Sequence, residues 1–187
     1  TATTPNRPRV TAQLMDAGYL GTAEILWEKN NYNAKYTAWG SWKSPSMPYL
    51  KYTWEFIEIF DKETHKKAGD REDIDITVAE FKEWVMAKWT FPPEHPMWEP
   101  NHRAMIPEEL PRRVMKLFSY RGDLVLDPFN GAGTTTRVAR ALGRRFIGID
   151  VSREYCGTAL SRTFPPGKRG AAAGPAPGVL FWEESPT

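Results

Sequence analysis

The sequence predicts an α/β fold, and two stretches of the chain carry that prediction. Residues 124–150 begin with an apolar run that ends in Asp127, continue through a turn with two glycines and a helical stretch, and finish with a second strand that ends at Asp150. A strand–helix–strand unit of this kind is typical of neighbouring parallel strands. Residues 52–60, YTWEFIEIF, alternate between apolar and polar side chains, which predicts a further strand.

The first half of the chain predicts an antiparallel strand pair between two helices. In the first helix Val10 and Leu14 share one side, and Gly18 ends it. A charged hinge over residues 61–75 precedes the second helix, against which the aromatic segment 84–91 is expected to pack. The expected elements are a helix over residues 7–17, strands over Leu20–Trp27 and Tyr52–Phe60, and a helix over Val78–Met86.

The second half predicts alternating helices and strands. Pro107 or Pro111 is expected near the start of its first helix, and Ser152 is the expected N-cap of its last. Residues 165–178 are rich in proline, glycine and alanine and predict a loose connection. The expected elements are helices over Ile106–Tyr120, Thr134–Leu142 and Arg153–Arg162, and strands over Leu124–Asp127, Arg145–Ile149 and Val179–Trp182.

The turn at residues 128–133 has the residue types of a site for an adenosine-bearing cofactor. Gly131 and Gly133 allow positive φ and close approach of a ligand to the backbone. Thr134 suits the start of a helix, whose free N–H groups form a polar end. Asp150 follows the turn at about the 20-residue spacing expected of an acid that accepts hydrogen bonds from ribose hydroxyls.

The turn favours S-adenosylmethionine over a nicotinamide dinucleotide. It has a G-x-G pattern without the third glycine of a dinucleotide fingerprint. It also opens with Asp127, whose carboxylate is unhelpful beside a pyrophosphate but suits the sulfonium and ammonium groups of S-adenosylmethionine. Two alternatives remain on the residues alone: a nicotinamide-dependent oxidoreductase, and a parallel strand–helix unit with an ordinary tight turn and no ligand.

The stretch DPFNGAGTT followed by FIGIDVSREYC resembles the DNA amino-methyltransferases that make N4-methylcytosine or N6-methyladenine. The resemblance implies a Rossmann-like methyltransferase fold, with a mixed, mostly parallel sheet, an antiparallel strand pair and helices on both faces. It also implies S-adenosylmethionine as the cofactor. The cofactor-binding residues that it implies in this part of the chain are Asp127, Pro128, Phe129, Asn130, Gly131, Gly133, Thr134, Asp150, Val151 and Ser152.

Two upstream segments are similar to the same family. HRAMIPEELP, residues 102–111, is similar to the family segment HPAxFPxxLP, which implies that Ala104, Ile106 and Pro107 complete the cofactor pocket. TAWGSWKSPS, residues 37–46, resembles a loop that faces the target base. The target-base residues implied are Trp39, Ser41, Trp42 and Ser44. Stacking aromatics beside small hydroxyls suit a flipped base, whereas composition alone favours tryptophans that cover a hydrophobic core.

The order of the segments resembles the permuted class of the family, in which the catalytic tetrapeptide comes first. That tetrapeptide is Asp/Asn/Ser-Pro-Pro-Tyr/Phe/Trp, and neither Pro-Pro pair of this chain matches it, in Phe91–Glu94 or in Phe164–Gly167. No catalytic residue is therefore assigned, and residues 1–187 are expected to be one methyltransferase domain that is incomplete at its N-terminus. Residues 20–60 would hold the strand pair with the target-side loop, and residues 102–162 the cofactor part.

The expected function is transfer of a methyl group from S-adenosylmethionine to an exocyclic amino group in double-stranded DNA. N4 of cytosine is preferred over N6 of adenine, and the enzyme would belong to a restriction–modification system. The alternatives are a methyltransferase for RNA or another amino group, and a non-catalytic DNA-binding subunit. A homodimer is a candidate assembly.

Composition sets wider bounds. The chain has 187 residues, 41% of them hydrophobic and 26% charged, with a net charge of +2. These values are ordinary for a soluble, cytoplasmic domain. Its single cysteine, Cys156, is expected in the core, and no metal site or membrane segment is predicted.

Two basic clusters stand out. Arg112, Arg113, Lys116 and Arg121 could meet phosphates, whereas Arg137, Arg140, Arg144 and Arg145 are interpreted as a solvated helix face.

Overall fold

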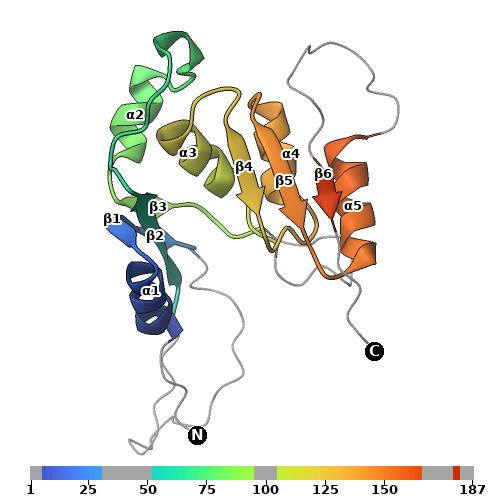
Figure 1. Cartoon of the computed structure of the whole chain (residues 1–187), viewed down its shortest axis with the longest axis horizontal. Coiled ribbons are helices and arrows are strands. Elements are labelled where there is room, and N and C mark those ends of the chain that lie inside the picture. Colours follow the sequence, from blue (N-terminus) through green and yellow to red (C-terminus); the bar gives the residue numbers. More distant parts are fainter. Residues whose placement is uncertain (1–5, 31–51, 95–104, 166–178, 182–187) are drawn as a thin grey trace, which may run out of the picture. The chain divides into compact units, whose positions relative to one another are not determined.

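The computed structural model describes residues 6–30, 52–94, 105–165 and 179–181 (Figure 1). The chain divides into two compact units. The first unit consists of Thr1–Ala68 and Met86–Pro92, and the second of Gly69–Val85 and Pro93–Thr187. Each unit has its own three-stranded sheet, and the predicted α/β class is confirmed. Within the described ranges, no helix is long and apolar enough to cross a membrane.

In the part of the chain that the structure describes, the first unit contains one helix and a mixed sheet. Strands β1 and β2 pair antiparallel, with Ile25 opposite Ile57, so the predicted strand pair is confirmed. The third strand, β3, pairs parallel to β1 and was not predicted. Ile25, Trp27 and Trp89 are buried and form the apolar interior of this unit. The elements are α1 (Asn6–Asp16), β1 (Tyr19–Glu28), β2 (Trp54–Lys62) and β3 (Lys88–Thr90), with the sheet order β2-β1-β3.

The second unit has a parallel sheet of order β4-β5-β6, whose strands point the same way in Figure 1. Helix α4 connects β4 to β5, and α5 connects β5 to β6, as the sequence predicts for parallel strands. The predicted strand near residue 180 is confirmed, because Ile149 pairs with Phe181. The elements are the 3-10 helix η1 (Arg71–Asp73), α2 (Val78–Trp84), α3 (Glu109–Phe118), β4 (Leu124–Asp127), α4 (Thr134–Ala141), β5 (Arg145–Ile149), α5 (Arg153–Thr163) and β6 (Val179–Phe181).

The core of the second unit lies between its helices and the sheet. It consists of four buried side chains, Met115, Val138, Ala139 and Phe146, from α3, α4 and β5. Val125, Leu142 and Phe164 are partly buried against them. Because Val125 faces this core, its neighbours Leu124 and Leu126 point to the other face of the sheet, where they are exposed. The core therefore fixes the direction in which β4 enters the glycine turn.

Helix α3 begins later than predicted, at Glu109 rather than Ile106. Ile106 precedes a proline, and a residue in that position is disfavoured from helical backbone angles. The Pro107 carbonyl instead accepts a hydrogen bond from Leu110 N at 3.0 Å, which makes the turn that leads into the helix. Pro111 lies in the first turn, where its missing N–H costs no intrahelical bond.

Candidate cofactor site

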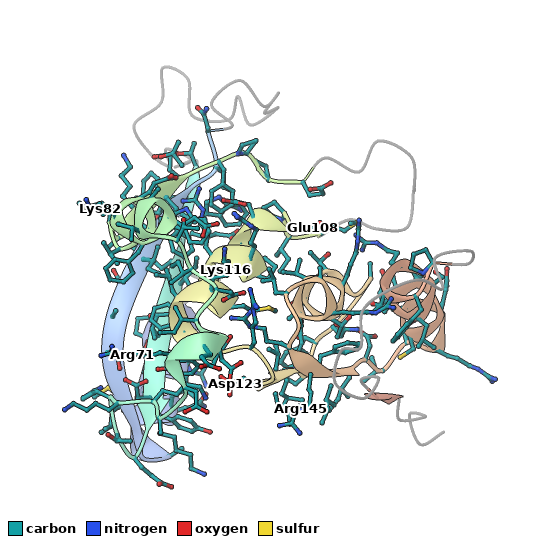
Figure 2. The ribbon with its side chains drawn as sticks, turned by 90° about the horizontal axis from the view of Figure 1, so that it is seen from above. Arg71, Lys82, Glu108, Lys116, Asp123 and Arg145 are labelled. Atoms are coloured by element: carbon teal, nitrogen blue, oxygen red, sulfur yellow. The ribbon has the colours of Figure 1, made fainter. Side chains whose placement is uncertain are left out.

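The glycine turn, residues 128–133, lies at the carboxyl ends of β4 and β5. Asn130 N donates to Ile149 O at 2.9 Å, so the turn is attached to the end of β5, and Gly133 N donates back to Asn130 O at 2.8 Å. At the opposite ends of these strands lie Asp123 and Arg145, both labelled in Figure 2. The carboxyl ends of parallel strands are where α/β folds bind ligands.

The two glycines of the turn have different physical roles. Both take the predicted positive φ, 49° at Gly131 and 81° at Gly133. A Cβ on Gly133 would lie 2.6 Å from Ala159 Cβ, so the close approach at Gly133 is made by helix α5 and not by a ligand. Among the described residues, a Cβ on Gly131 would meet only Phe129 O, at 4.0 Å. The open space for a ligand is therefore at Gly131.

Asp150 binds the glycine turn directly. Its Oδ2 accepts a hydrogen bond from Gly131 N at 2.9 Å, and its Oδ1 accepts one from Ser152 N at 2.8 Å. A carboxylate has about four acceptor positions, so capacity remains for hydroxyl donors. The predicted ribose role is compatible with this geometry, but Asp150 has a second task, which is to join the turn to the segment between β5 and α5.

Around the same turn, two apolar side chains are exposed and two polar side chains are buried. Phe129 is 88% exposed and Val151 is 77% exposed, which leaves an aromatic ring and a branched side chain free to contact a planar ligand. Asn130 and Thr134 are buried, and Asn130 Oδ1 is one of two buried side-chain oxygens without a hydrogen bond among the described residues. Asp127 accepts a hydrogen bond from Phe129 N at 2.9 Å. The turn thus has the carboxylates, the exposed ring and the space that an adenosine with a cationic tail requires.

Comparison with known proteins shows which family has this arrangement. A family model described as DNA methylase matches residues 4–161. The chain belongs to the DNA methylase family. The type II methyltransferase M.MjaI of Methanocaldococcus jannaschii is 33% identical over 156 residues, which cover 80% of this chain and 51% of that protein. M.MthZI of Methanothermobacter thermautotrophicus is 31% identical, covering 81% of this chain and 45% of that protein.

A solved structure agrees with the family. TTHA0409 of Thermus thermophilus, which carries the provisional description DNA modification methylase, superposes with a TM-score of 0.69 at 25% identity. The match covers 87% of this chain and 64% of that protein. The chain spans about half the length of the curated relatives it matches.

The upstream segment that is predicted to complete the cofactor pocket is partly described. Pro107 is buried and Ile106 is half-buried, whereas Ala104 lies outside the described residues. Glu108, labelled in Figure 2, pairs with Arg137 at 2.6 Å, which places the start of α3 beside α4. The remaining predicted cofactor residues, Pro128, Val151 and Ser152, lie in the connections after β4 and β5, as expected. Ser152 is also confirmed as the N-cap of α5, since its side chain accepts from Tyr155 N.

The predicted target-base residues, Trp39, Ser41, Trp42 and Ser44, lie outside the described residues. The structure does describe the residues on both sides of that segment. Lys29 forms an ion pair with Glu55, and Lys29 N donates to Thr53 O at 2.8 Å. The Lys29 ammonium also lies 5.2 Å from the centre of the Trp27 ring. These contacts hold the residues before and after the target-side segment next to one another.

The two basic clusters of the sequence have different surroundings from those expected. In the first cluster the cations of α3 pair with carboxylates, Arg112 and Lys116 with Glu80 and Arg113 with Glu83. Their charges are balanced within the protein, which weakens the prediction that they meet phosphates. In the second cluster, the solvated-face interpretation is wrong for Arg144, which is only 2% exposed. Arg144 forms a two-pronged ion pair with Asp75.

Cys156 lies behind Asp150 and is buried, as predicted. Burial raises the pKa of its thiol, and the negative charge of Asp150 raises this pKa further. The Cys156 side chain is consequently a neutral thiol that packs in the interior and is a poor nucleophile. Sequence reasoning missed Ala159 and Lys29, because the contacts of both depend on which segments meet in the folded chain.

Proposed function

We propose that this chain binds S-adenosylmethionine and belongs to a methyltransferase that modifies an exocyclic amino group in double-stranded DNA. The observation that carries the proposal is the glycine turn tied to Asp150, with open space at Gly131 and the exposed ring of Phe129 beside it. The turn holds no third glycine for a pyrophosphate, and Asp127 supplies a negative charge for a cationic ligand.

Different residues bind different parts of the cofactor. Asp150 accepts from ribose hydroxyls while it keeps its bonds to the two backbone N–H groups. Phe129 and Val151 contact the adenine, and Asp127 attracts the positively charged end of the ligand. When bound, S-adenosylmethionine would supply an activated methyl group for the amino nitrogen of the base, leaving as S-adenosylhomocysteine while the nitrogen loses a proton. The contribution of the protein is to hold the two reactants in position.

The base is handled by other parts of the protein. Trp39 and Trp42 would stack on a base extruded from the duplex, and Ser41 and Ser44 would hydrogen-bond its edge. The relatives named above are type II methyltransferases, and we infer a modification enzyme of the same restriction–modification type. The second candidate is a non-catalytic DNA-binding subunit, which the lack of the catalytic Pro-Pro tetrapeptide among residues 1–187 permits.

Titration calorimetry followed by a transfer assay tests the proposal. The chain is titrated with S-adenosylhomocysteine and, separately, with NADH, and only the first is expected to bind. Tritiated S-adenosylmethionine is then supplied with double-stranded DNA or RNA, and labelled DNA is digested to nucleosides for mass spectrometry. N4-methylcytosine is the expected product, and N6-methyladenine would correct the base alone. Binding without transfer would show that residues 1–187 do not catalyse the reaction by themselves, whereas binding of NADH alone would contradict the proposed cofactor.

A further inference from the structure

Helix α5 contacts the glycine turn at residues that no cofactor motif includes. Ala159 is fully buried and occupies the space beside Gly133. Three residues further along the helix, the Arg162 guanidinium donates a hydrogen bond to the Ala132 carbonyl at 2.8 Å. Positions three apart lie on the same side of a helix, so one side of α5 supports the turn.

The bond from Arg162 fixes a particular peptide group. The peptide that joins Ala132 to Gly133 has its carbonyl bound by Arg162 and its N–H bound to Asn130 O at 2.8 Å. A peptide group held at both ends has one orientation available to it. The preceding N–H groups are also engaged, that of Gly131 by Asp150 and that of Asn130 by Ile149 O. Three of these four bonds come from partners outside the turn, so its shape depends on the residues around it.

We propose that Arg162 is a positioning residue for cofactor binding, which holds the 132–133 peptide of the glycine turn in its bound shape before the cofactor arrives. The inference rests on the proposed S-adenosylmethionine site. A loop that is already ordered loses less conformational entropy when a ligand binds, so preorganisation raises affinity without a contact to the ligand. Arg162 acts through the turn and makes no contribution to the chemistry.

The alternative to a positioning role is a purely structural one, in which Arg162 only anchors the C-terminal end of α5. A variant of Arg140 distinguishes these two roles. The Arg140 guanidinium on α4 bonds the Thr163 carbonyl and lies 4.3 Å from the centre of the Phe164 ring. It therefore holds the same end of α5 as Arg162, by the same kind of bond, but both of these partners lie outside the glycine turn. Arg140→Met is the matched control for Arg162→Met.

The test measures S-adenosylhomocysteine affinity by calorimetry for the wild type, Arg162→Met, Arg162→Lys and Arg140→Met. We expect Arg162→Met to bind S-adenosylhomocysteine about tenfold more weakly than the wild type does. Arg162→Lys, which keeps one cationic donor, is expected to recover part of the affinity. Arg140→Met is expected to stay within about twofold of the wild type, even if its melting temperature falls.

Hydrogen exchange without cofactor tests the positioning step itself. The amides of residues 130–134 should exchange faster in Arg162→Met than in Arg140→Met, while those of β5 stay protected in both. Wild-type affinity in Arg162→Met, or equal losses in both methionine variants, would overturn the inference alone. A wild type that does not bind S-adenosylhomocysteine would overturn the proposed function as well. If Arg162→Met is too unstable to assay, the affinity and the hydrogen exchange of Arg162→Lys are compared with those of the wild type and Arg140→Met instead.

Discussion

Asp150 is the residue on which the cofactor site most depends, because it has both a binding role and a structural one. Its two oxygens accept hydrogen bonds from Gly131 N and Ser152 N, which join the glycine turn to the segment before α5. Bonds from neutral N–H groups to a charged acceptor are stronger than bonds between neutral groups. A substitution at this position should therefore change the protein even when no cofactor is present.

We predict that Asp150→Ala weakens S-adenosylhomocysteine binding by more than about tenfold, or about 1.4 kcal/mol. The melting temperature of the cofactor-free protein should also fall, since two backbone donors lose their acceptor. Calorimetry and thermal denaturation measure the two effects. Glu154→Ala, an exposed acid in the first turn of α5, is the matched control and should leave both values unchanged. Unchanged affinity in Asp150→Ala would remove this residue from the site.

Asn130 differs from Asp150, because its buried side-chain oxygen makes no hydrogen bond among the described residues. Because its Oδ1 makes no hydrogen bond among the described residues, replacing the side chain by an apolar one of similar volume removes no bond from that oxygen. We expect Asn130→Leu to keep or raise the melting temperature of the cofactor-free protein. Thermal denaturation checks this, and a fall of several degrees would show that the amide stabilises the turn through its nitrogen.

The sequence could predict the positions of these residues but only some of their partners. The spacing between the glycine turn and Asp150 is a local pattern, and its ligand role follows from chemistry that is visible in the sequence. Contacts between distant residues are not visible there. The pairing of Gly133 with Ala159 and of Ala132 with Arg162 depends on how α5 packs against α4, which no spacing in the chain reveals.

At the scale of elements, α2 and α3 are held together by a charged network around Glu80. Lys116, labelled in Figure 2, donates to the Glu80 carboxylate at 2.6 Å, and Arg112 does so at 2.5 Å. The Arg112 guanidinium also lies 4.8 Å from the centre of the buried Trp84 ring. Glu80 further completes a capping box with Thr77 at the start of α2. One carboxylate thus both begins α2 and joins it to α3.

The pKa of Glu80 makes the stability of this pair depend on pH. Burial alone would raise this pKa, but the hydrogen bonds from Lys116 and Thr77 outweigh it and lower the pKa from 4.5 to about 2. Because the folded-state pKa is depressed, the stabilisation is complete above about pH 4.5 and is lost as the pH falls toward 2. Urea unfolding of the wild type and Glu80→Gln should show a stability difference at pH 7 that shrinks between about pH 4.5 and pH 2.5.

The matched control for this prediction is Glu83→Gln. The Glu83 side chain is 66% exposed and pairs with Arg113 at 3.2 Å, so its loss should change stability little at any pH. A difference between the wild type and Glu80→Gln that stays constant across the pH range would contradict the assigned role of the charge.

The sequence predicted most elements because their signals are local. The alternation in β2 and the N-cap of α5 each occupy a few consecutive residues, and both were found. Strand β3 was missed because its residues, Lys88–Thr90, are too few to show alternation. Its strand geometry comes from pairing with β1, far earlier in the chain, as in the register of Trp27 with Trp89. Such short strands exist only through their partners.

At the scale of the whole molecule, long-range polar contacts join segments within the second unit that are distant in sequence. Arg144 is the main example in the second unit. Its side chain is fully buried and pairs with Asp75, 69 residues earlier in the chain. It also donates to Ser119 O at 2.8 Å, after α3, and to Leu142 O at 2.8 Å, after α4. One guanidinium thus joins three segments that the sequence patterns treat as independent.

We predict that Arg144→Met lowers the free energy of unfolding by about 3 kcal/mol, because Asp75 is left as a buried charge without its partner. Arg145→Met, which removes an exposed guanidinium that bonds the Gly122 carbonyl, should cost less than about 1 kcal/mol. The double variant Arg144→Met/Asp75→Leu removes both charges and should recover much of the loss. Denaturant unfolding of the four proteins checks the series. Without recovery in the double variant, the carbonyl bonds at Ser119 and Leu142 would be the larger contribution of Arg144, and its role would be to end two helices and not to balance a charge.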